Sequence, residues 1–432
     1  MKILDTAFAT RNILELPEPE PRRPSAPSPL DGLRVLDFTH FIAGPMATMI
    51  LADGGAQVIK VEPPGRGDDF RYYPPADPRA PRDGVPFLWV NRNKKSLVLD
   101  LKNPAGLKVA KDLVRNSDVL VENFSSGTLD RLGLGYETCR ALNPRLIYAT
   151  ASAYGSRGEA ADRGGFDAIA QAESGFMSMN GYADREGVKT GATVMDMATA
   201  MMLSNAILMA LTARQRDDQG QRLEVCLFDT GLFMTGFAPM QYMFTGVQPP
   251  RGGNTPPDTS PSGVFQCRDR SFMLNSGNAR IFGRLVKDVL GCTELQEDPA
   301  WGDVGYRITH RDRLSAILNR EFARFEWAEL QGRLRAAKVP HGEVRTLPEA
   351  LNSREATQRR RVTRIRHKKL GWVPNYPLPF ELMSTPLREA TASPGLGEHS
   401  MEVLSQLYSP DHIQSLSAQG AFGAAGLPDL DP

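Results

Sequence analysis

Short apolar segments alternate with longer amphipathic ones over the first half of the chain. Strands are predicted at residues 32–38, 57–62, 96–101, 118–122 and 145–151. Helices are predicted at residues 46–52, 104–116, 129–142 and 168–176, and in 104–116 the apolar residues recur at helical spacing. This alternation predicts an α/β fold with a Rossmann-like parallel sheet and helices on both of its faces. Ligands of such sheets bind in the loops that follow the carboxyl ends of the strands.

Residues 191–214 predict the central helix of this fold. From Met197 on, the segment is rich in Ala, Leu and Met, which favour helix, and it holds no Pro or Gly. The charged turn at 216–220 closes the helix, so one buried helix is expected. A further strand is predicted at 223–227 and is followed by an apolar segment at 228–244.

Asp196 is the only acidic residue in 191–214, and it lies where the helix is predicted to begin. Aspartate is a preferred N-cap residue, and the spacing alone favours this structural role. The alternative is a reactive carboxylate at the mouth of a pocket, where the helix dipole favours the anion by about 0.3–1 kcal/mol. With an ordinary pKa near ~3.9, the carboxylate is expected to be ionised at neutral pH. It would then act as a nucleophile without a neighbouring base, unlike a serine.

The composition shifts at 248–262, where Pro, Gly and Thr dominate, and we expect a domain boundary there. Residues 1–29 read as a Pro-rich N-terminal arm, and 30–247 as a large domain that holds Asp196. Residues 248–345 are expected to form a smaller α+β domain, and 346–432 a connector and a C-terminal part that returns to the large domain. The small domain is predicted to contain strands at 264–267 and 271–274 and helices at 281–290, 311–325 and 327–337. The basic segment 359–369 reads most simply as a solvated connector, with phosphate binding as the less favoured alternative, and 397–419 as helix broken at Ser409-Pro410.

The composition is that of an ordinary globular protein, with 41% hydrophobic and 23% charged residues among 432. A net charge of +1 argues against nucleic acid as the main partner. The four cysteines form no CxxC pair and the six histidines form no HxxxH set, which disfavours a metal site and a disulfide framework. No apolar run reaches the roughly 20 residues that span a membrane, and no secretory signal is evident. The expected location is therefore cytoplasmic.

Two glycine loops, 65–68 and 251–254, match neither a dinucleotide fingerprint nor a P-loop, which disfavours a nucleotide triphosphatase and a plain Rossmann dehydrogenase. Cationic residues near predicted strands, at 91–95, Lys102 and Arg131, suit phosphate groups. Solvated surface charge remains the favoured interpretation for any one of them.

Four further residues keep a structural and a functional interpretation. His40 follows a predicted strand and is read as a hydrogen-bonding residue rather than an acid or base, and His399 as a helix cap. Asp167 is either the N-cap of the helix at 168–176 or a second carboxylate that lines a cleft. Phe124 is either a stacking surface for an aromatic ring or part of the core.

Six segments, taken together and in order, resemble those of a known family. They lie at residues 30–45, 51–62, 91–96, 121–124, 129–133 and 396–399. The chain resembles the family III CoA-transferases, which include formyl-CoA:oxalate and carnitine CoA-transferases. The resemblance covers nearly everything from residue 30 to the C-terminus, and its ordered set of segments is specific where each segment alone is modest.

The resemblance implies roles for particular residues. Asp196 falls on the family's nucleophile, an aspartate at the start of a helix. Contacts with coenzyme A are implied at Ile42, Ala43, Leu99, Lys102, Asn123, Phe124, Ser125 and Arg131. Phe166 and Asp167 fall on a pair that lines the acyl end of the site. The family also implies an acyl-CoA donor, a small carboxylic acid acceptor, no metal, and an interlocked homodimer.

The function expected on this basis is CoA transfer through an acyl-aspartyl anhydride and an aspartyl-CoA thioester. The alternatives are an acyl-CoA racemase or isomerase of the same fold and a non-catalytic CoA-binding subunit. The racemase branch has a histidine where this chain has Phe166, and phenylalanine cannot exchange a proton. The oxalate-using branch has a run of glycines where this chain has residues 255–261, TPPDTSP. A dicarboxylate acceptor would require a second cation, for which Arg163 and Arg251 are the candidates.

Overall fold

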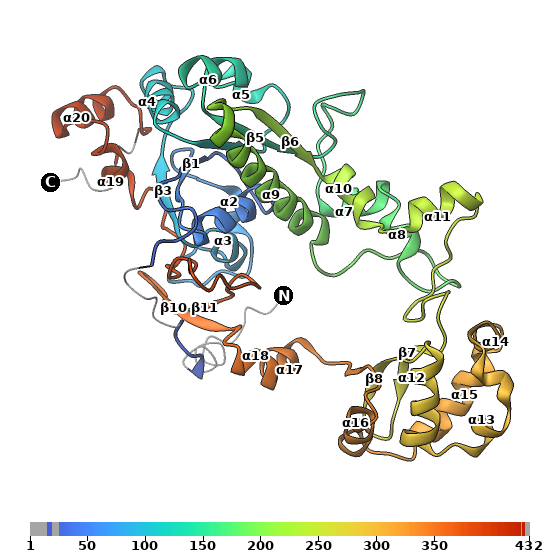
Figure 1. Cartoon of the computed structure of the whole chain (residues 1–432). Coiled ribbons are helices and arrows are strands. Elements are labelled where there is room, and N and C mark those ends of the chain that lie inside the picture. The colour runs from blue at the N-terminus through green and yellow to red at the C-terminus, as the bar shows by residue number, and fades with distance from the viewer. Residues whose placement is uncertain (1–14, 20–25, 425, 428–432) are drawn as a thin grey trace. The chain divides into compact units, whose positions relative to one another are not determined.

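The computed structural model describes residues 15–19, 26–424 and 426–427. The chain forms two compact units, each with its own hydrophobic core (Figure 1). Of the described residues, the sheet unit comprises 15–19, 26–174, 190–236, 354–424 and 426–427, and the α+β unit comprises 175–189 and 237–353.

The sheet unit is built on a six-stranded parallel sheet, as the alternating pattern predicts. Its strands run in the spatial order β3-β2-β1-β4-β5-β6, and every neighbouring pair is parallel. The strands are β1 (Arg34–Asp37), β2 (Gln57–Glu62), β3 (Lys94–Val98), β4 (Val119–Glu122), β5 (Ile147–Ser152) and β6 (Arg222–Cys226).

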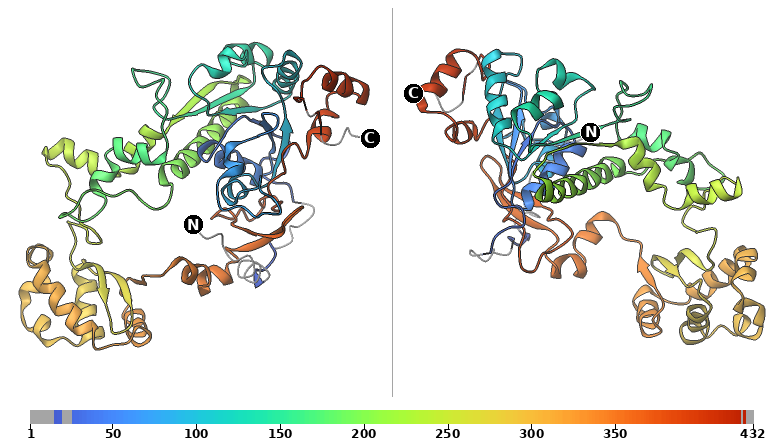
Figure 2. Two further views of the ribbon diagram at one scale, coloured as in Figure 1. Left: turned by 180° about the vertical axis from the view of Figure 1, so that it is seen from behind. Right: turned by 45° about the horizontal axis from the view of Figure 1, so that its top comes forward.

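Helices cover both faces of this sheet (Figures 1 and 2). Helices α2 (Ala43–Asp53) and α9 (Val194–Asp217) pack on one face. The other face is covered by α4 (Pro104–Arg115), α6 (Tyr136–Leu142), α19 (Ser400–Leu404) and α20 (Pro410–Ala418). Successive strand residues point to opposite faces, so Val35, Val58 and Val119 join the first core and Leu36, Ile59 and Leu120 the second.

The structure corrects the predicted lengths of two helices. The helix expected at 129–142 is divided into α5 (Thr128–Arg131) and α6, because Gly133 adopts a φ of +77° and Gly135 follows it. The helix expected at 168–176 is α7 (Asp167–Glu173), and Gly175, with a φ of +81°, separates it from α8 (Phe176–Met179). Glycine tolerates this left-handed backbone, which interrupts a helix.

The basic segment at 359–369 is not a plain connector, and this expectation was wrong. It contributes β10 (Thr363–His367), which pairs with β11 (Gly371–Asn375) as an antiparallel hairpin. Thr363, Ile365 and His367 are buried at alternate positions, as in a strand with one buried face. Because arginines lie between them, the sequence pattern indicated a basic segment rather than a strand. The guanidinium groups of Arg364 and Arg366 stack on the Trp372 ring at 4.3 Å and 4.2 Å.

The α+β unit contains an antiparallel sheet of β7 (Ser262–Gln266), β8 (Ser271–Asn275) and β9 (His341–Glu343). Its aromatic core includes Trp301, Phe272 and Phe322. The unit also holds α8, α11 (Ala238–Thr245), α12 (Ala279–Arg284), α14 (Val304–Thr309), α15 (Arg311–Phe322) and α16 (Trp327–Ala336).

By length and composition, α9 alone among the described helices could cross a membrane. Half of its most apolar window is buried against the protein, as in the core helix of a globular domain.

Candidate active site

The residues implied to contact CoA follow the carboxyl ends of three strands. Ile42 and Ala43 follow β1, and Leu99 and Lys102 follow β3. Asn123, Phe124 and Ser125 follow β4, and Arg131 closes α5 beyond them. Because the strands are parallel, these loops meet at one edge of the sheet, where ligands of such folds bind.

Helix α9 begins at this same edge. The Arg214 side chain, near the C-terminal end of α9, donates hydrogen bonds to the carbonyls of Asp118 (3.4 Å) and Arg145 (3.0 Å). Asp118 and Arg145 lie just before β4 and β5, so the helix ends at the amino edge of the sheet. The opposite end, with Asp196, therefore lies toward the carboxyl edge and the predicted CoA loops.

Asp196 does not cap α9, so the structural role favoured by its spacing was wrong. Thr193 is the N-cap residue, and its side chain makes no capping hydrogen bond. Asp196 lies three residues later, in the first turn, and its side chain is partly exposed. No described residue forms a hydrogen bond or an ion pair with its carboxylate. A carboxylate without a protein partner is available to react.

The Asp167 side chain accepts a backbone hydrogen bond at the start of α9, a role that the N-cap residue Thr193 does not fill. Its Oδ1 accepts the backbone N–H of Met195 at 2.7 Å, at the start of α9. Its Oδ2 accepts from Gln171 at 2.6 Å, and the Gln171 side-chain oxygen accepts the backbone N–H of Thr190 at 2.9 Å. The N-cap of α7 is Phe166, so Asp167 does not cap its own helix. It is a second carboxylate beside Asp196.

The two carboxylates change the acidity of the site. Burial and, to a lesser extent, the negative charge of Asp167 together raise the pKa of Asp196 to about 7. The expectation that Asp196 is fully ionised at neutral pH was therefore wrong. The helix dipole, at about 0.3–1 kcal/mol, offsets less than one unit of this shift.

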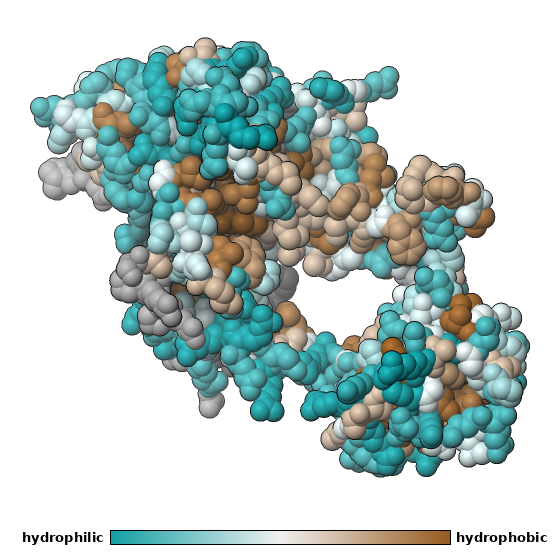
Figure 3. Space-filling model, viewed as in Figure 1, coloured by the Kyte–Doolittle hydropathy of each residue, from teal (hydrophilic) through white to brown (hydrophobic). Residues whose placement is uncertain are grey.

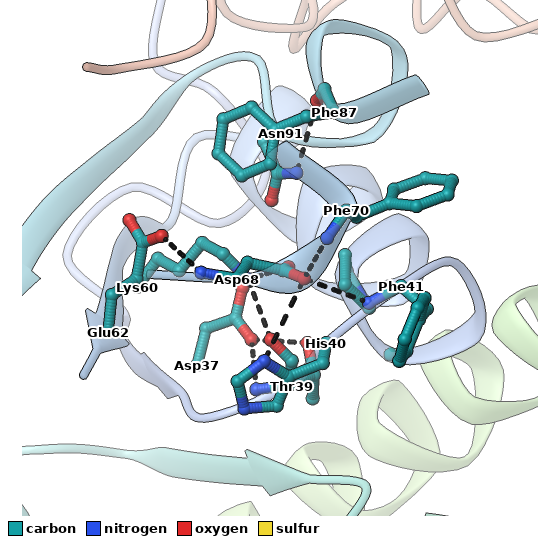
Figure 4. A network of polar contacts seen from close by, with 12 residues as sticks. Asp37, Thr39, His40, Phe41, Lys60, Glu62, Asp68, Phe70, Phe87 and Asn91 are labelled. Carbon is teal, nitrogen blue, oxygen red and sulfur yellow. Dashed lines mark hydrogen bonds and ion pairs between the residues drawn. The ribbon is translucent and has the colours of Figure 1, made fainter. Parts of the chain in front are cut away.

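A buried ion network holds the loop after β1 (Figure 4). Lys94 donates to Asp37 at 2.9 Å, while Lys60 pairs with Asp68 at 2.9 Å and donates to the Thr39 carbonyl at 2.6 Å. Burial alone would raise the pKa of Asp37, but Lys94 and Lys60 hold it below its usual range. Burial lowers the pKa of Lys94 to about 8 in spite of Asp37. The network fixes the backbone from which Ile42 and Ala43 follow.

This network also corrects the interpretation of the cationic segment at 91–95. Lys94 is fully buried in the network, and Arg92 is buried in an ion pair of 2.6 Å with Asp53. Neither is available to a phosphate or solvated at the surface. Lys102 and Arg131 are exposed, as a phosphate-binding residue must be.

His40 makes its hydrogen bonds through its backbone, and the structural interpretation of its ring stays a prediction. Its backbone N–H donates to the Asn123 side chain at 2.8 Å, and its carbonyl accepts from the same amide at 2.8 Å. Its ring lies edge-on to Phe124 and 3.7 Å from Asp68. His399 is the N-cap residue of α19 but makes no capping hydrogen bond with its side chain, whose Nδ1 accepts the Ser96 N–H at 3.4 Å.

The predicted contact residues differ in what they can offer a ligand. Leu99 is 1% and Ala43 6% exposed as whole residues, and the Leu99 N–H is bound to the Glu62 carbonyl at 3.0 Å, so both residues are buried in this structure. Phe124 is partly buried against the core, while Ser125 and Phe166 are exposed. Within the described ranges, no group of three or more His, Cys, Asp or Glu residues is placed to hold a metal ion.

Sequence reasoning missed Gln171 and the charged pairs beneath the loops. Gln171 is fully buried, and no local pattern distinguishes it from a surface glutamine. Lys60 carried a signal, because it interrupts the apolar strand β2 and is buried there. Its partner Asp68 lies in a loop and could not be assigned from spacing.

Comparison with known proteins identifies the family. Residues 30–400 match the model of CoA-transferase family III. The chain belongs to this family.

Among its relatives, the acetyl-CoA:oxalate CoA-transferase of Acetobacter aceti is 38% identical over 78% of this chain and 85% of its own length. The succinate–glutarate CoA-transferase of Agrobacterium fabrum is 34% identical over 89% of this chain and 97% of its own. A solved CAIB/BAIF family protein from Brucella suis superimposes with a TM-score of 0.80 at 32% identity, covering 88% of this chain and all of that one. The chain is thus an enzyme, a family III CoA-transferase that uses an acyl-CoA and a carboxylate.

Proposed function

We propose that this enzyme transfers CoA through covalent intermediates on the Asp196 carboxylate. The observation that carries the proposal is the position of this group. It is partly exposed at the start of α9, toward the carboxyl edge of the sheet, and no described residue binds it.

The reaction proceeds by four acyl exchanges. The Asp196 carboxylate attacks the thioester carbonyl of the donor and expels CoA thiolate, which gives an acyl-aspartyl anhydride. The thiolate then attacks the aspartyl carbonyl, releasing the donor acid and leaving an aspartyl-CoA thioester. The acceptor carboxylate attacks this thioester to give a second anhydride and CoA thiolate. The thiolate attacks the acceptor's carbonyl, and Asp196 is regenerated without net proton transfer.

The surrounding residues bind and protect these intermediates. We assign CoA binding to the loops that hold Ile42, Ala43 and Leu99 and to the side chains of Lys102, Asn123, Phe124, Ser125 and Arg131. Phe166 and Asp167 lie at the acyl end. Backbone N–H groups near the start of α9 stabilise the tetrahedral oxyanions. Water must be excluded because an anhydride hydrolyses.

The test compares Asp196→Asn with Asp217→Asn, which removes an acid from the other end of the same helix. The first variant is expected to lose transferase activity by roughly 10³-fold or more, because it lacks the nucleophile, and the second to retain it. Hydroxylamine added with the donor thioester should label Asp196 in the wild type, as read by mass spectrometry. Near-wild-type transfer by folded Asp196→Asn would refute the proposal.

A second candidate function is a subunit of a heteromeric transferase. One relative, 32% identical over 88% of this chain, is the beta subunit of the succinyl-CoA–L-malate CoA-transferase of Chloroflexus aurantiacus. If the purified chain bound acyl-CoA but formed no acyl-enzyme until another protein was added, this second function would hold.

We further propose that the enzyme is an interlocked homodimer. Helix α11 supports this, because Met243 is 68% and Phe244 82% exposed on it, and the hydropathy surface shows apolar residues over this helix (Figure 3). On α9, Met209 is 72% exposed in the same manner. Exposed apolar surface of this extent is typical of a protein interface.

A further inference from the structure

Four aromatic rings gather beside the paired carboxylates. Phe41 lies at the centre of this aromatic cluster, edge-on to Phe166 at 5.7 Å, to Tyr73 at 5.8 Å and to Phe70 at 6.0 Å. The Phe70 side chain is buried, while Tyr73 is 48% and Phe166 63% exposed. The exposed rings offer apolar surface that no described residue covers.

The cluster is joined to the start of α9 by covalent and hydrogen bonds. Phe166 directly precedes Asp167, whose carboxylate accepts the N–H of Met195, the residue before Asp196. On its other side, Phe41 belongs to the loop that the ion network holds, and Figure 4 shows the Phe41 and Phe70 rings at the opposite end of that network from Glu62.

The backbone of Phe41 is strained, and neighbouring side chains hold it in that conformation. Its φ is +64°, a left-handed conformation that costs a residue with a side chain roughly 1–2 kcal/mol. The Asp68 carboxylate accepts the Phe41 N–H at 3.4 Å, and the neighbouring His40 N–H is fixed by Asn123. Strain of this kind persists where the surrounding structure enforces it, commonly at a binding site.

The two cations considered for a dicarboxylate acceptor are both engaged. Arg163 pairs with both oxygens of Glu173, at 2.7 Å and 3.3 Å, and stacks on Tyr154 at 4.6 Å. Arg251 donates to the carbonyls of Ser178, Tyr182 and Arg185 within the α+β unit. Lys60 and Lys94 are buried in the ion network.

A second carboxylate on the substrate would therefore meet the negative charges of Asp167 and Asp196, and the contacts of Arg163 and Arg251 hold both guanidinium groups elsewhere. Like charges repel, and partial burial strengthens the repulsion. An aromatic or bulky apolar group would instead gain dispersion and edge-to-face contacts, worth about 0.5–1.5 kcal/mol per ring pair beyond its buried area.

We infer that the acid exchanged at Asp196 is a monocarboxylic acid with an aromatic or bulky apolar tail, which packs on Phe166, Tyr73 and Phe41. This inference rests on the proposed chemistry at Asp196. It departs from the names of the relatives, which act on oxalate or on succinate and glutarate.

The experiment uses the full-length wild-type protein with acetyl-CoA as donor and compares 3-phenylpropanoate with glutarate as acceptors, identifying each thioester by mass. We expect kcat/KM for 3-phenylpropanoate to exceed that for glutarate at least tenfold. Phe166→Ala should reduce this ratio about tenfold, as Tyr73→Ala should to a smaller extent. Ile169→Ala is the matched control, because it removes an exposed apolar side chain from the same helix outside the cluster.

The outcomes separate the inference from the proposed function. A wild-type preference for glutarate, with transfer still abolished in Asp196→Asn, would overturn the substrate class and leave the chemistry standing. An unchanged ratio in Phe166→Ala that retains its circular dichroism spectrum would also overturn it. Transfer that persists in Asp196→Asn would remove the proposed chemistry and the inference together.

Discussion

Asp196 lies in the first turn of α9, and Asp167 of α7 accepts a hydrogen bond from that turn. The proximity of the two carboxylates sets the pH range in which Asp196 reacts. Only the carboxylate form can attack a thioester. With a pKa of about 7, roughly half of the groups carry a proton at neutral pH. Burial and the charge of Asp167 thus reduce the reactive fraction and leave the ionised form poorly solvated, which favours its attack on a carbonyl.

The pH profile tests this pairing. We expect kcat/KM for the donor thioester to rise with pH through about 7 and to level off above it, because the carboxylate is the reactive form. Asp167→Asn removes the neighbouring negative charge while keeping an oxygen for the Met195 N–H. The rise of kcat/KM with pH should therefore move to lower pH. Asp217→Asn should leave the profile in place. Superimposable profiles for Asp167→Asn and the wild type would show that Asp167 does not act on Asp196.

The same shift predicts a stability effect. The folded-state pKa of Asp196 lies above its ordinary value of 3.8, so the folded protein loses stability as pH rises toward and through about 7. Asp196→Asn carries no such penalty and should raise the free energy of unfolding by about 1–3 kcal/mol at pH 8, with a smaller gain at pH 5.5. Urea unfolding at both pH values measures this. A variant less stable than the wild type at pH 8 would contradict the expectation.

At the scale of elements, strong local periodicity made β2 and α4 predictable. Strand β2 begins and ends at the predicted residues, and α4 ends one residue before its predicted end. Strand β10 was not predicted, because arginines alternate with its buried residues. The helix at 129–142 was predicted too long, because it was continued across Gly133, whose φ is positive. In both cases tertiary burial and backbone conformation decided the structure, and neither is visible in apolar spacing alone.

Helix α4 provides a test of close packing. A Cβ on Gly106 would lie 2.2 Å from the Asp100 carbonyl oxygen and 2.8 Å from that of Ala421. Gly106→Ala should therefore destabilise the protein by about 2–4 kcal/mol, in spite of the helix propensity of alanine. Gly332→Ala in α16 is the matched control, since nothing lies within 4 Å of its Cβ, and it should be neutral or stabilising. Thermal unfolding of both variants decides, and equal transitions would refute the packing argument.

For the whole molecule, the sequence predicted a parallel sheet and placed the candidate loops at its carboxyl edge. It could not predict pairs that tertiary folding brings together, such as Lys94 with Asp37 or Ser96 with His399. The position of Asp196 was predictable as a helix start, whereas its missing cap and its neighbour Asp167 depend on how α7 meets α9. Local pattern determined the elements, and long-range contacts determined the chemistry of the site.

The exposed apolar face of α11 leads to a prediction about assembly. A single chain of 47.5 kDa that exposes Met243 and Phe244 at 68% and 82% would be prone to aggregate, whereas a homodimer would cover them. Light scattering after size exclusion should give about 95 kDa, twice 47.5 kDa, for the wild type. The double variant Met243→Asp, Phe244→Asp should yield monomer or aggregate and lose activity, because a charge in a buried interface has no partner.

Val304→Asp is the control for this prediction, since it places the same charge on an exposed apolar residue of α14, in the same unit but on another helix. It should remain dimeric and active. If the wild type were monomeric and fully active at assay concentration, the exposed face of α11 would need another partner, and interlocking would be excluded. If the double variant remained a dimer of normal activity, the interface would lie elsewhere, because two buried aspartates could not be accommodated without loss of affinity.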